Sequence, residues 1–450
     1  MRLTAAVLAA LLSATAAAET ANLADILNAA VEADPEWFAA QRTLDADRQL
    51  ATQGRAAMLP SLTATYSYGR NWREYEGGGL GDLRFDNEVV GLSLVQPLFR
   101  PDTWYAGSQG KAASNAGEAR FEQARQDFLL RVTERYLDVL RRWEDLETAR
   151  AEERALGRQL EQTRERFDVG LVPVTDVEEA QAAYDLSRVL LISAESDFDV
   201  SRDQLEALTG QRWDKLAGLR EELPMSGPEP AAPEHWMERA RNNNPQVLAS
   251  RYEADAAKAV SKQRTSAQLP SVNLVGRYED VGFSNANITP PPGSTQFLAY
   301  EGKSIGIEAS LPLFAGGGLN SQRKEASYRY QAAEEAYRLV WRDVGQAAQS
   351  LARQVATSAQ NVQARRQALR SAESALRATE SGYEVGTRNV VDVLTAQRNL
   401  YANQRDYSAA RYDYIVLSLR LQAAAGELAR DDIETINAWL SPDVTVELAD

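Results

Sequence analysis

Apolar residues recur every seven positions along four long stretches of the chain, two before and two after a pair of similar turns. Before the turns the repeated positions are Val132, Val139, Leu146, Glu153, Leu160 and Phe167, and then Val355, Val362, Leu369, Leu376 and Tyr383. After the turns they are Val177, Tyr184, Leu191, Phe198 and Leu205, and then Val393, Leu400, Tyr407, Tyr414 and Leu421. A sustained seven-residue repeat predicts helices packed in a left-handed supercoil. The pattern therefore predicts two long helical hairpins.

The two predicted hairpins are copies of one design. Val169-Gly170 recurs 216 positions later as Val385-Gly386, and adding 216 maps one apolar ladder onto the other. The exception is Glu153, which corresponds to Leu369. Further matches lie upstream at offsets of 210 and 215: Leu59-Pro60-Ser61 with Leu269-Pro270-Ser271, and Pro97-Leu98-Phe99 with Pro312-Leu313-Phe314. The chain therefore contains two copies of one unit, and the residues inserted between matching segments lie in loops.

This duplication sets the expected organisation of the chain. A charged start, an apolar run from Leu3 to Leu12 and an Ala-x-Ala site at Ala16-Ala17-Ala18 indicate a signal peptide, the alternative being an N-terminal helix of the fold. The expected parts are a signal peptide at 1–18, a first repeat at 19–210 with its tip at 168–176, a linker at 211–234, a second repeat at 235–426 with its tip at 384–392, and a polar tail at 427–450.

Four shorter segments alternate apolar and polar residues at the two-residue period of a strand. They lie at about 60–70, 86–99, 270–280 and 304–314, and their alternating sets begin with Leu62, Val90, Val272 and Ile305. Each is about ten residues long, which suits a tilted strand crossing a bilayer. Aromatic residues near the strand ends fit an interfacial belt: Tyr66, Tyr68, Trp72, Trp104 and Tyr105. The alternative is a small soluble sheet packed on the helices.

Two long polar loops, Asn71–Asp86 and Asp280–Lys303, join the strands of each repeat, as extracellular loops of a barrel do. Four strands cannot close a membrane barrel, because spanning barrels need about eight or more. An open sheet edge in hydrocarbon would leave backbone groups without hydrogen bonds. The membrane interpretation therefore requires an oligomer, and strand number alone leaves both a dimer and a trimer open.

Composition excludes several other classes of protein. The chain has no cysteine, one histidine and a net charge of −15. Disulfides, thiolate metal sites and lipid attachment at an N-terminal cysteine are therefore excluded, and a histidine-dependent catalytic site is disfavoured. The net negative charge also argues against nucleic acid as a partner. Gly316-Gly317-Gly318 lacks the Gly-Lys-Ser/Thr ending of a phosphate loop, so it indicates a strand-to-helix corner. We expect no enzyme, no cofactor and no metal site.

The two tips carry a resemblance to a known family. The segments Phe167–Val177 and Tyr383–Leu394 resemble the two periplasmic tips of the TolC family of outer-membrane efflux channels, and the similarity extends over nearly all of the mature chain. This resemblance implies a homotrimer with a 12-stranded β-barrel in the outer membrane lipid, continued by a long α-helical coiled-coil tunnel in the periplasm. It also implies two partners, a periplasmic adaptor (membrane-fusion) protein and an inner-membrane transporter of the RND or ABC type. The lack of cysteine distinguishes the chain from acylated members.

The resemblance also assigns a gate to the tips. Asp392 matches the acid that lines the closed aperture, where three copies would form a carboxylate ring that attracts cations. The alternative is structural, because Asn389 would cap a helix with Asp392 in its first turn. Thr395 stands where the best-known relatives carry a second acid, which predicts weaker block by cations.

A latch is the second feature that the resemblance assigns: Tyr383 and Arg388 of one hairpin holding Thr175 and Asp176 of the other. The alternative for Thr175 is a helix N-cap with Glu178 in a capping box. An exposed ion pair contributes at most about 1 kcal/mol, so such a latch would be weak enough for a partner to open.

Exposed turns at the two tips are the expected adaptor contacts: Val169, Gly170 and Leu171, and Val385, Gly386 and Thr387. The alternative is a hairpin turn without a partner. The expected function is an outer-membrane exit duct for tripartite efflux, type I secretion or both. A passive porin-like channel and a periplasmic coiled-coil scaffold remain rival functions.

Overall fold

The computed structural model describes residues 20–73, 83–287 and 298–448. The expected signal peptide lies outside the described residues, and so do parts of both long polar loops. The described residues form two compact units. The helical unit comprises the residues up to Ala40, Glu122–Asn244 and those from Arg342 onward; the sheet unit comprises Gln41–Phe121 and Pro245–Trp341.

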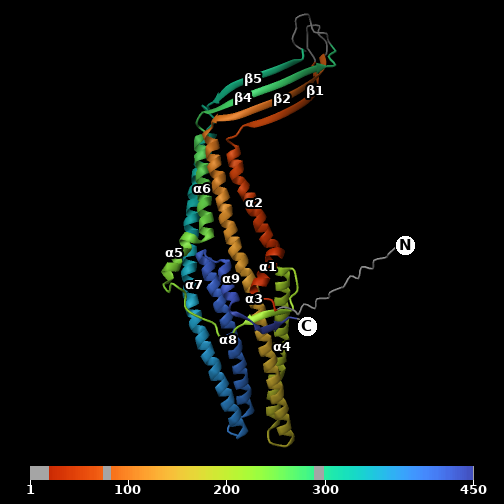
Figure 1. The fold of residues 1–450 in the computed structure, drawn as a ribbon, viewed down its shortest axis with the longest axis vertical. Coiled ribbons are helices and arrows are strands. Elements are labelled where there is room, and N and C mark those ends of the chain that lie inside the picture. The colour runs from red at the N-terminus through yellow and green to blue at the C-terminus, as the bar shows by residue number, and fades with distance from the viewer. Residues whose placement is uncertain (1–19, 74–82, 288–297, 449–450) are drawn as a thin grey trace, which may run out of the picture. The chain divides into compact units, whose positions relative to one another are not determined.

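Long helices form the two predicted hairpins, as Figure 1 shows. The hairpin helices are α3 (Pro101–Asp168) with α4 (Val174–Thr209), and α7 (Gly318–Glu384) with α8 (Val390–Ala425). The shorter helices are α1 (Leu23–Ala33), α2 (Pro35–Ala56), α5 (Pro233–Asn243), α6 (Pro245–Ser266) and α9 (Arg430–Asn437). Proline begins four helices, where its missing N–H leaves no hydrogen bond unmade. None of the described helices is long and apolar enough to cross a membrane.

The predicted seven-residue ladder forms the core of the helical unit. Val132, Val139 and Leu146 of α3 are buried, together with Phe198 of α4 and Val355 of α7. These side chains pack in one cluster with α8 and the short helices around them. Burying such side chains is the main stabilising contribution to a helical bundle.

Glu153, the exception in the ladder, has a specific partner. The hydroxyl of Tyr184 on α4 hydrogen-bonds the Glu153 carboxylate, and this contact raises the pKa of Tyr184 above its usual value. The carboxylate therefore joins the two helices of the first hairpin by a polar contact. The matching position of the second hairpin is the apolar residue Leu369.

A two-stranded sheet corrects the expected linker and tail. Strand β3 (Lys215–Leu219) pairs antiparallel with β6 (Leu440–Glu447), and the tail also contains α9. Leu216 and Val446 are buried in the core, and the Tyr136 hydroxyl donates a 2.6 Å hydrogen bond to the Ala217 carbonyl. The sequence pattern missed β3 because five residues are too few to show an alternation beside the surrounding prolines and glycines.

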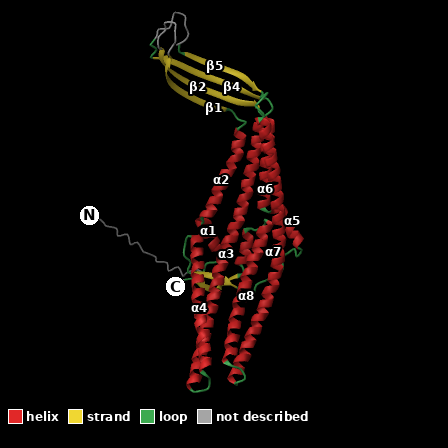
Figure 2. Ribbon diagram, turned by 180° about the vertical axis from the view of Figure 1, so that it is seen from behind, coloured by secondary structure: helices red, strands yellow, loops and turns green. Residues whose placement is uncertain are grey.

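A four-stranded antiparallel sheet contains the predicted long strands, as Figure 2 shows. The strands are β1 (Ser61–Arg73), β2 (Leu83–Phe99), β4 (Ser271–Ser284) and β5 (Tyr300–Ser310), in the order β1-β2-β4-β5. The expectation for the fourth strand was partly wrong, because β5 ends at Ser310. A corner follows, in which Gly316 and Gly317 adopt positive φ values of 58° and 81°, a backbone conformation that favours glycine.

The sheet has one apolar and one polar face. The register places on one face Leu62, Ala64 and Tyr66 of β1, Val90, Leu92 and Leu94 of β2, Leu274 and Gly276 of β4, and Ile305 and Ile307 of β5. It places on the other face Thr63, Thr65, Ser93, Arg277, Glu279, Ser304 and Glu308. Most of the apolar residues of β1 and β5 are exposed in the single chain. Among the described strands, β1 pairs only with β2 and β5 only with β4, so both edges of the sheet are open.

Candidate functional site: the two hairpin tips

The turns at the two hairpin tips have the same backbone geometry. Gly170 and Gly386 have φ values of 77° and 79°. In the first turn the Leu171 amide donates to the Arg166 carbonyl at 2.8 Å; in the second, the Thr387 amide donates to the Gly382 carbonyl at 2.8 Å. This is the glycine-ended closure that satisfies the last carbonyls of a helix. The 216-residue repeat therefore extends to individual hydrogen bonds.

The six residues expected to contact an adaptor are exposed, and they lie at the ends of these turns. Val169, Leu171 and Val385 are among the exposed large apolar side chains of the described chain. A Cβ atom added at Gly170 or Gly386 would meet no other atom within 4 Å. Each tip thus presents apolar side chains beside exposed glycine backbone. Such a surface is suited to close approach by another protein.

Helix α8 begins with a complete capping box. The Asn389 side chain accepts a 2.8 Å hydrogen bond from the Asp392 amide, and the Asp392 carboxylate accepts one of 3.4 Å from the Asn389 amide. The structural role expected for Asn389 is therefore confirmed. Arg388 lies 3.8 Å from the same carboxylate. Asp392 is partly exposed and Thr395 is exposed one turn later, so both are accessible in the single chain.

Helix α4 begins differently, and this corrects the expected cap at Thr175. The helix starts at Val174, and Pro173 occupies the N-cap without a side-chain hydrogen bond. The Pro173 carbonyl accepts from the Asp176 amide at 3.2 Å, which places Thr175 inside the first turn. The sequence pattern missed this start because Thr175 matches the preferred cap residues, whereas a proline cap has no side-chain acceptor.

The four latch residues do not meet within one chain. Among the described residues, Tyr383 and Arg388 have no hydrogen bond or ion pair with Thr175 or Asp176. Arg388 lies beside Asp392 instead, and the buried hydroxyl of Tyr383 has no hydrogen-bond partner. The latch therefore stays a prediction.

A different contact joins the tips. The Arg166 guanidinium lies 4.5 Å from the ring centre of Tyr383, within the range of a cation–π interaction. Beside it a small apolar cluster packs both hairpins together: Leu156, Leu160, Ala180, Ala183, Val390 and Leu394. Arg166 does not stand out in the sequence pattern, because its counterpart in the second repeat, Gly382, has no side chain.

Further from the tips, charged pairs join α3 to α8. Glu152 of α3, whose side chain is 3% exposed, accepts a 2.7 Å hydrogen bond from Arg405 of α8. Glu144 accepts from the hydroxyl groups of Ser408 and Tyr412, the latter at 2.6 Å. These contacts link the first hairpin to the second along their length.

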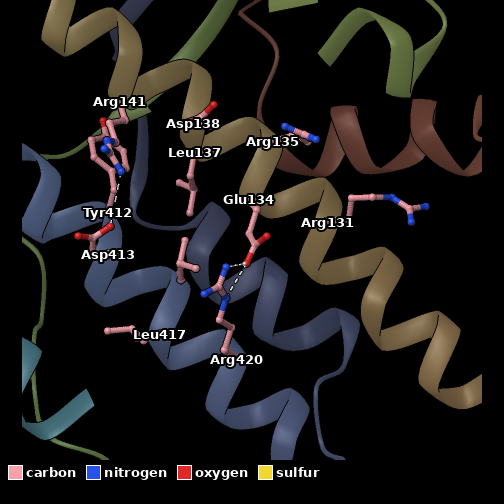
Figure 3. A pocket seen from close by; sticks show the side chains of 11 residues that line it. Arg131, Glu134, Arg135, Leu137, Asp138, Arg141, Tyr412, Asp413, Leu417 and Arg420 are labelled. Carbon is pink, nitrogen blue, oxygen red and sulfur yellow. Dashed lines mark hydrogen bonds and ion pairs between the residues drawn. The ribbon is translucent and has the colours of Figure 1, made fainter. Parts of the chain in front are cut away.

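A polar pocket of about 610 Å³ lies between the same helices (Figure 3). Arg420 of α8 is directed at Glu134 of α3, 2.8 Å away, and Arg141 lies 3.6 Å from Asp413. The arginines that line the pocket already pair with carboxylate or amide side chains. The pocket is therefore part of the contact between the two hairpins. Among the residues that the structure describes, no group of three or more His, Asp or Glu side chains is placed to hold a metal ion.

The duplicated unit of two strands and a helical hairpin, repeated in one chain, defines a class of channel protein. The model of the outer membrane efflux protein family matches residues 26–211 and 236–427, and the chain belongs to this family. It is an efflux channel of the outer membrane. The model matches twice, once in each half of the chain.

Individual relatives agree with this assignment. The chain is 35% identical to the outer membrane protein TolC of Vibrio cholerae, over 93% of this chain and 94% of that protein. It is 30% identical to the alkaline protease secretion protein AprF of Pseudomonas aeruginosa, over 93% and 87% of the two chains. The crystal structure of the outer membrane protein VceC of Vibrio cholerae shares the fold, with a TM-score of 0.72, 23% identity and coverage of 90% and 96%.

Proposed function

We propose that three copies of this chain pool their strands into a 12-stranded barrel in the outer membrane, continued by an α-helical tunnel in the periplasm. The assembly is the exit duct of a tripartite efflux or type I secretion system. The observation that carries the proposal is the four-stranded sheet, which has an exposed apolar face and two open edges. Backbone groups at such edges cost several kcal/mol each in hydrocarbon unless they are paired. Further copies supply the pairing.

The experiment measures the mass of the purified protein in detergent and its conductance in planar bilayers. We expect a trimer that conducts with low conductance at rest. A lone subunit that conducts nothing would overturn the proposal. A scaffold without membrane strands would be soluble without detergent, and a passive porin-like channel would stay open in isolation.

The tips are the proposed docking surface for a periplasmic adaptor, which connects the duct to an inner-membrane transporter of the RND or ABC type. The support is the exposure of Val169, Leu171 and Val385 beside two open glycine turns. Single cysteines at Gly170 and Gly386 should crosslink to the adaptor, whereas a cysteine at the exposed Val200 on α4 is the matched control. Equal crosslinking at all three positions would reject tip docking.

Asp392 forms the proposed aperture ring. Its carboxylate is partly exposed at the start of α8, and three copies around a threefold axis would hold three negative charges together. We expect Asp392→Ala to abolish channel block by multivalent cations, and Thr395→Asp to strengthen the block by adding a second ring. Block that persists in Asp392→Ala would show that other residues hold the cation.

Tyr383 and Arg388 form the proposed latch, with Thr175 and Asp176 of a neighbouring copy as their partners. Arg388 has donors left over from its contact with Asp392, and the Tyr383 hydroxyl has no partner in the described part of its own chain. The double variant Arg388→Ser, Tyr383→Phe should raise single-channel conductance. An unchanged low conductance would defeat the latch. We assign the chain no catalytic activity and no cofactor.

A further inference from the structure

The apolar face of the four-stranded sheet becomes polar at one end of the strands. This loop end is the end that contains Trp72 of β1 and Arg84 of β2, away from the connections to α2 and α3. Toward it, the residues on this face are, in order, Leu62, Ala64, Tyr66, Tyr68, Arg70 and Trp72 on β1, and Leu94, Leu92, Val90, Glu88, Asp86 and Arg84 on β2.

The polar face of the sheet changes in the opposite sense. At the loop end it carries Leu83, Phe85 and Val281, which are buried, and Phe283, whose ring centre lies 6.0 Å from that of Phe85. A barrel wall needs an apolar outer face only where it crosses hydrocarbon. The reversal of both faces therefore marks the height at which the sheet leaves the lipid.

This reversal lies nearer the helices on β5 than on β1. Tyr66 of β1 shares its row with Val90, Asp280 and Glu301. The first apolar residue of β5 on the same face is Ile305, four positions beyond Glu301. Four residues span about 13 Å along a strand, and β1 and β5 are about 14 Å apart across the sheet. A membrane plane gives such a step when the strands are tilted by about 40°, as strands in membrane barrels are.

Two arginines and a tryptophan lie together just beyond the reversal. Trp72 is directly opposite Arg84, and Arg70 is opposite Asp86 in the next row. Trp72 is 64% exposed, and the side chains of Arg70 and Arg84 are exposed too. On tilted strands each such row adds about 5 Å of height, so Arg70 and Arg84 lie about 5 and 10 Å above Tyr68. Their long side chains can reach the headgroup layer, which is about 5–8 Å deep.

Hydrogen bonds to the backbone fix the position of Arg84. Its amide donates to the side-chain oxygen of Asn287 at 2.6 Å, and its carbonyl accepts from the Asn287 amide at 3.0 Å. These bonds continue the pairing of β2 beyond Ser284, where β4 ends. Among the residues that the structure describes, the Arg84 guanidinium forms no ion pair. Its charge and its N–H groups are therefore available to a ligand.

A buried acid fixes the position of Arg70. Its Nε and Nη2 atoms donate to the Asp86 carboxylate at 2.8 and 3.2 Å. That carboxylate is 3% exposed and also accepts from the Tyr68 hydroxyl and the Asn285 amide group, each at 2.7 Å. The contact uses two of the five N–H groups of Arg70, which leaves three for another acceptor. Asp86 offsets the charge of Arg70, and the charge of Arg84 remains.

We infer that Arg70, Trp72 and Arg84 bind the phosphate group of an anionic lipid headgroup, on the outward face of the barrel at its loop end. The inference rests on the proposed assembly, which turns this face toward lipid. Guanidinium groups match phosphate oxygens with paired N–H groups. A tryptophan ring with its polar N–H suits the headgroup level of a membrane. Glu88, the next acid on the face, hydrogen-bonds Tyr66 and lies two rows from Arg84.

The test titrates the assembled protein in detergent with phosphatidylglycerol or phosphatidylcholine and counts the bound lipids by native mass spectrometry. Arg84→Gln removes one cation without changing the contacts of Asp86. Arg70→Gln is combined with Asp86→Asn, so that no buried carboxylate loses its counter-charge. The matched control is Arg277→Gln, which removes an exposed arginine from the polar face of the same sheet.

We expect the unaltered protein to bind phosphatidylglycerol several-fold more tightly than phosphatidylcholine. Arg84→Gln should lose most of this preference, the triple variant should lose all of it, and Arg277→Gln should keep it. A preference that survives in the triple variant would overturn the inference. Displacement of the lipid by inorganic phosphate at matched ionic strength would indicate a site for free anions and would also overturn it. Failure of the unaltered protein to assemble would overturn the proposed function instead.

Fluorescence quenching tests the height of the site independently of lipid affinity. Trp72 is one of eight tryptophans, so its emission is taken as the difference between the unaltered protein and Trp72→Phe. Both are placed in vesicles of equal parts phosphatidylglycerol and phosphatidylcholine, with a spin label on the headgroup or deep in the acyl chain. The headgroup label should quench Trp72 several-fold more than the acyl-chain label. Stronger quenching by the acyl-chain label, or none by either, would place Trp72 away from the headgroups and overturn the inference.

Discussion

A charged pair in the middle of the helical hairpins is largely buried, whereas a charged pair at their tips is exposed. In the middle, Glu152 is almost fully buried and bonded to Arg405, which is 32% exposed. At the tips, Arg388 and Asp392 lie 3.8 Å apart with exposed fractions of 60% and 39%. Removing one partner of a buried pair costs several kcal/mol, whereas exposed pairs contribute about 1 kcal/mol or less.

This difference indicates where the hairpins can separate. At the tips, a small apolar cluster and a cation–π interaction join the two hairpins. The buried hydroxyl of Tyr383 beside them has no hydrogen-bond partner among the described residues. Contacts between α3 and α8 further along include Glu152, Glu144 and Glu134, each bonded to α8. Opening that begins at the tips would therefore leave the pairs between α3 and α8 intact.

The largest effect should come from Arg405→Ala. It leaves the Glu152 carboxylate buried without a counter-charge, which costs about 3–5 kcal/mol. Thermal denaturation in detergent should show a clear loss of stability, with faster amide exchange along α3 and α8. The double variant Glu152→Leu, Arg405→Leu should recover most of the loss, because no charge is then buried. Unchanged thermal stability of Arg405→Ala would show that the pair is solvated.

The next largest loss of stability should come from the glycine turn that both tips share. Gly170→Val and Gly386→Val each force a β-branched residue into positive φ, at a cost of about 1–2 kcal/mol. The two losses should agree, since the turns have the same geometry. Asparagine tolerates this conformation and is the matched control at both positions. Unequal losses, measured by amide exchange at Leu171 and Thr387, would reveal contacts that only one tip makes.

The helix starts after the two turns should respond differently. Asn389→Ala removes the cap of α8 and should destabilise that end by about 1 kcal/mol. Thr175→Ala should change stability by less than about 0.5 kcal/mol, because Thr175 is not the cap of α4 and is exposed. Amide exchange in the first turns of α4 and α8 measures both. Equal effects would mean that Thr175 also caps its helix.

Long-range periodicity made most of the fold predictable. The ladder from Val132 to Leu146 and its copy determined the hairpins, and the alternation from Leu62 determined the strands and their faces. Short elements escaped because their signals are local: β3 has five residues, and the start of α4 depends on Pro173 rather than on the more typical Thr175. Packing partners were also beyond the pattern. Arg166 contacts Tyr383 across two hairpins, and no spacing within either repeat indicates it.

The smallest effect on stability should come from Tyr383→Phe. The hydroxyl has no partner among the described residues, so its removal loses no hydrogen bond to them and should change stability by less than about 0.5 kcal/mol. Arg166→Ala removes the cation–π contact and should cost about 0.5–1 kcal/mol. Conductance separates two roles of this tyrosine. If Tyr383→Phe alone opens the assembled channel without loss of stability, its hydroxyl bonds a neighbouring copy; if only Arg166→Ala opens it, the ring contact within each chain keeps the tip closed.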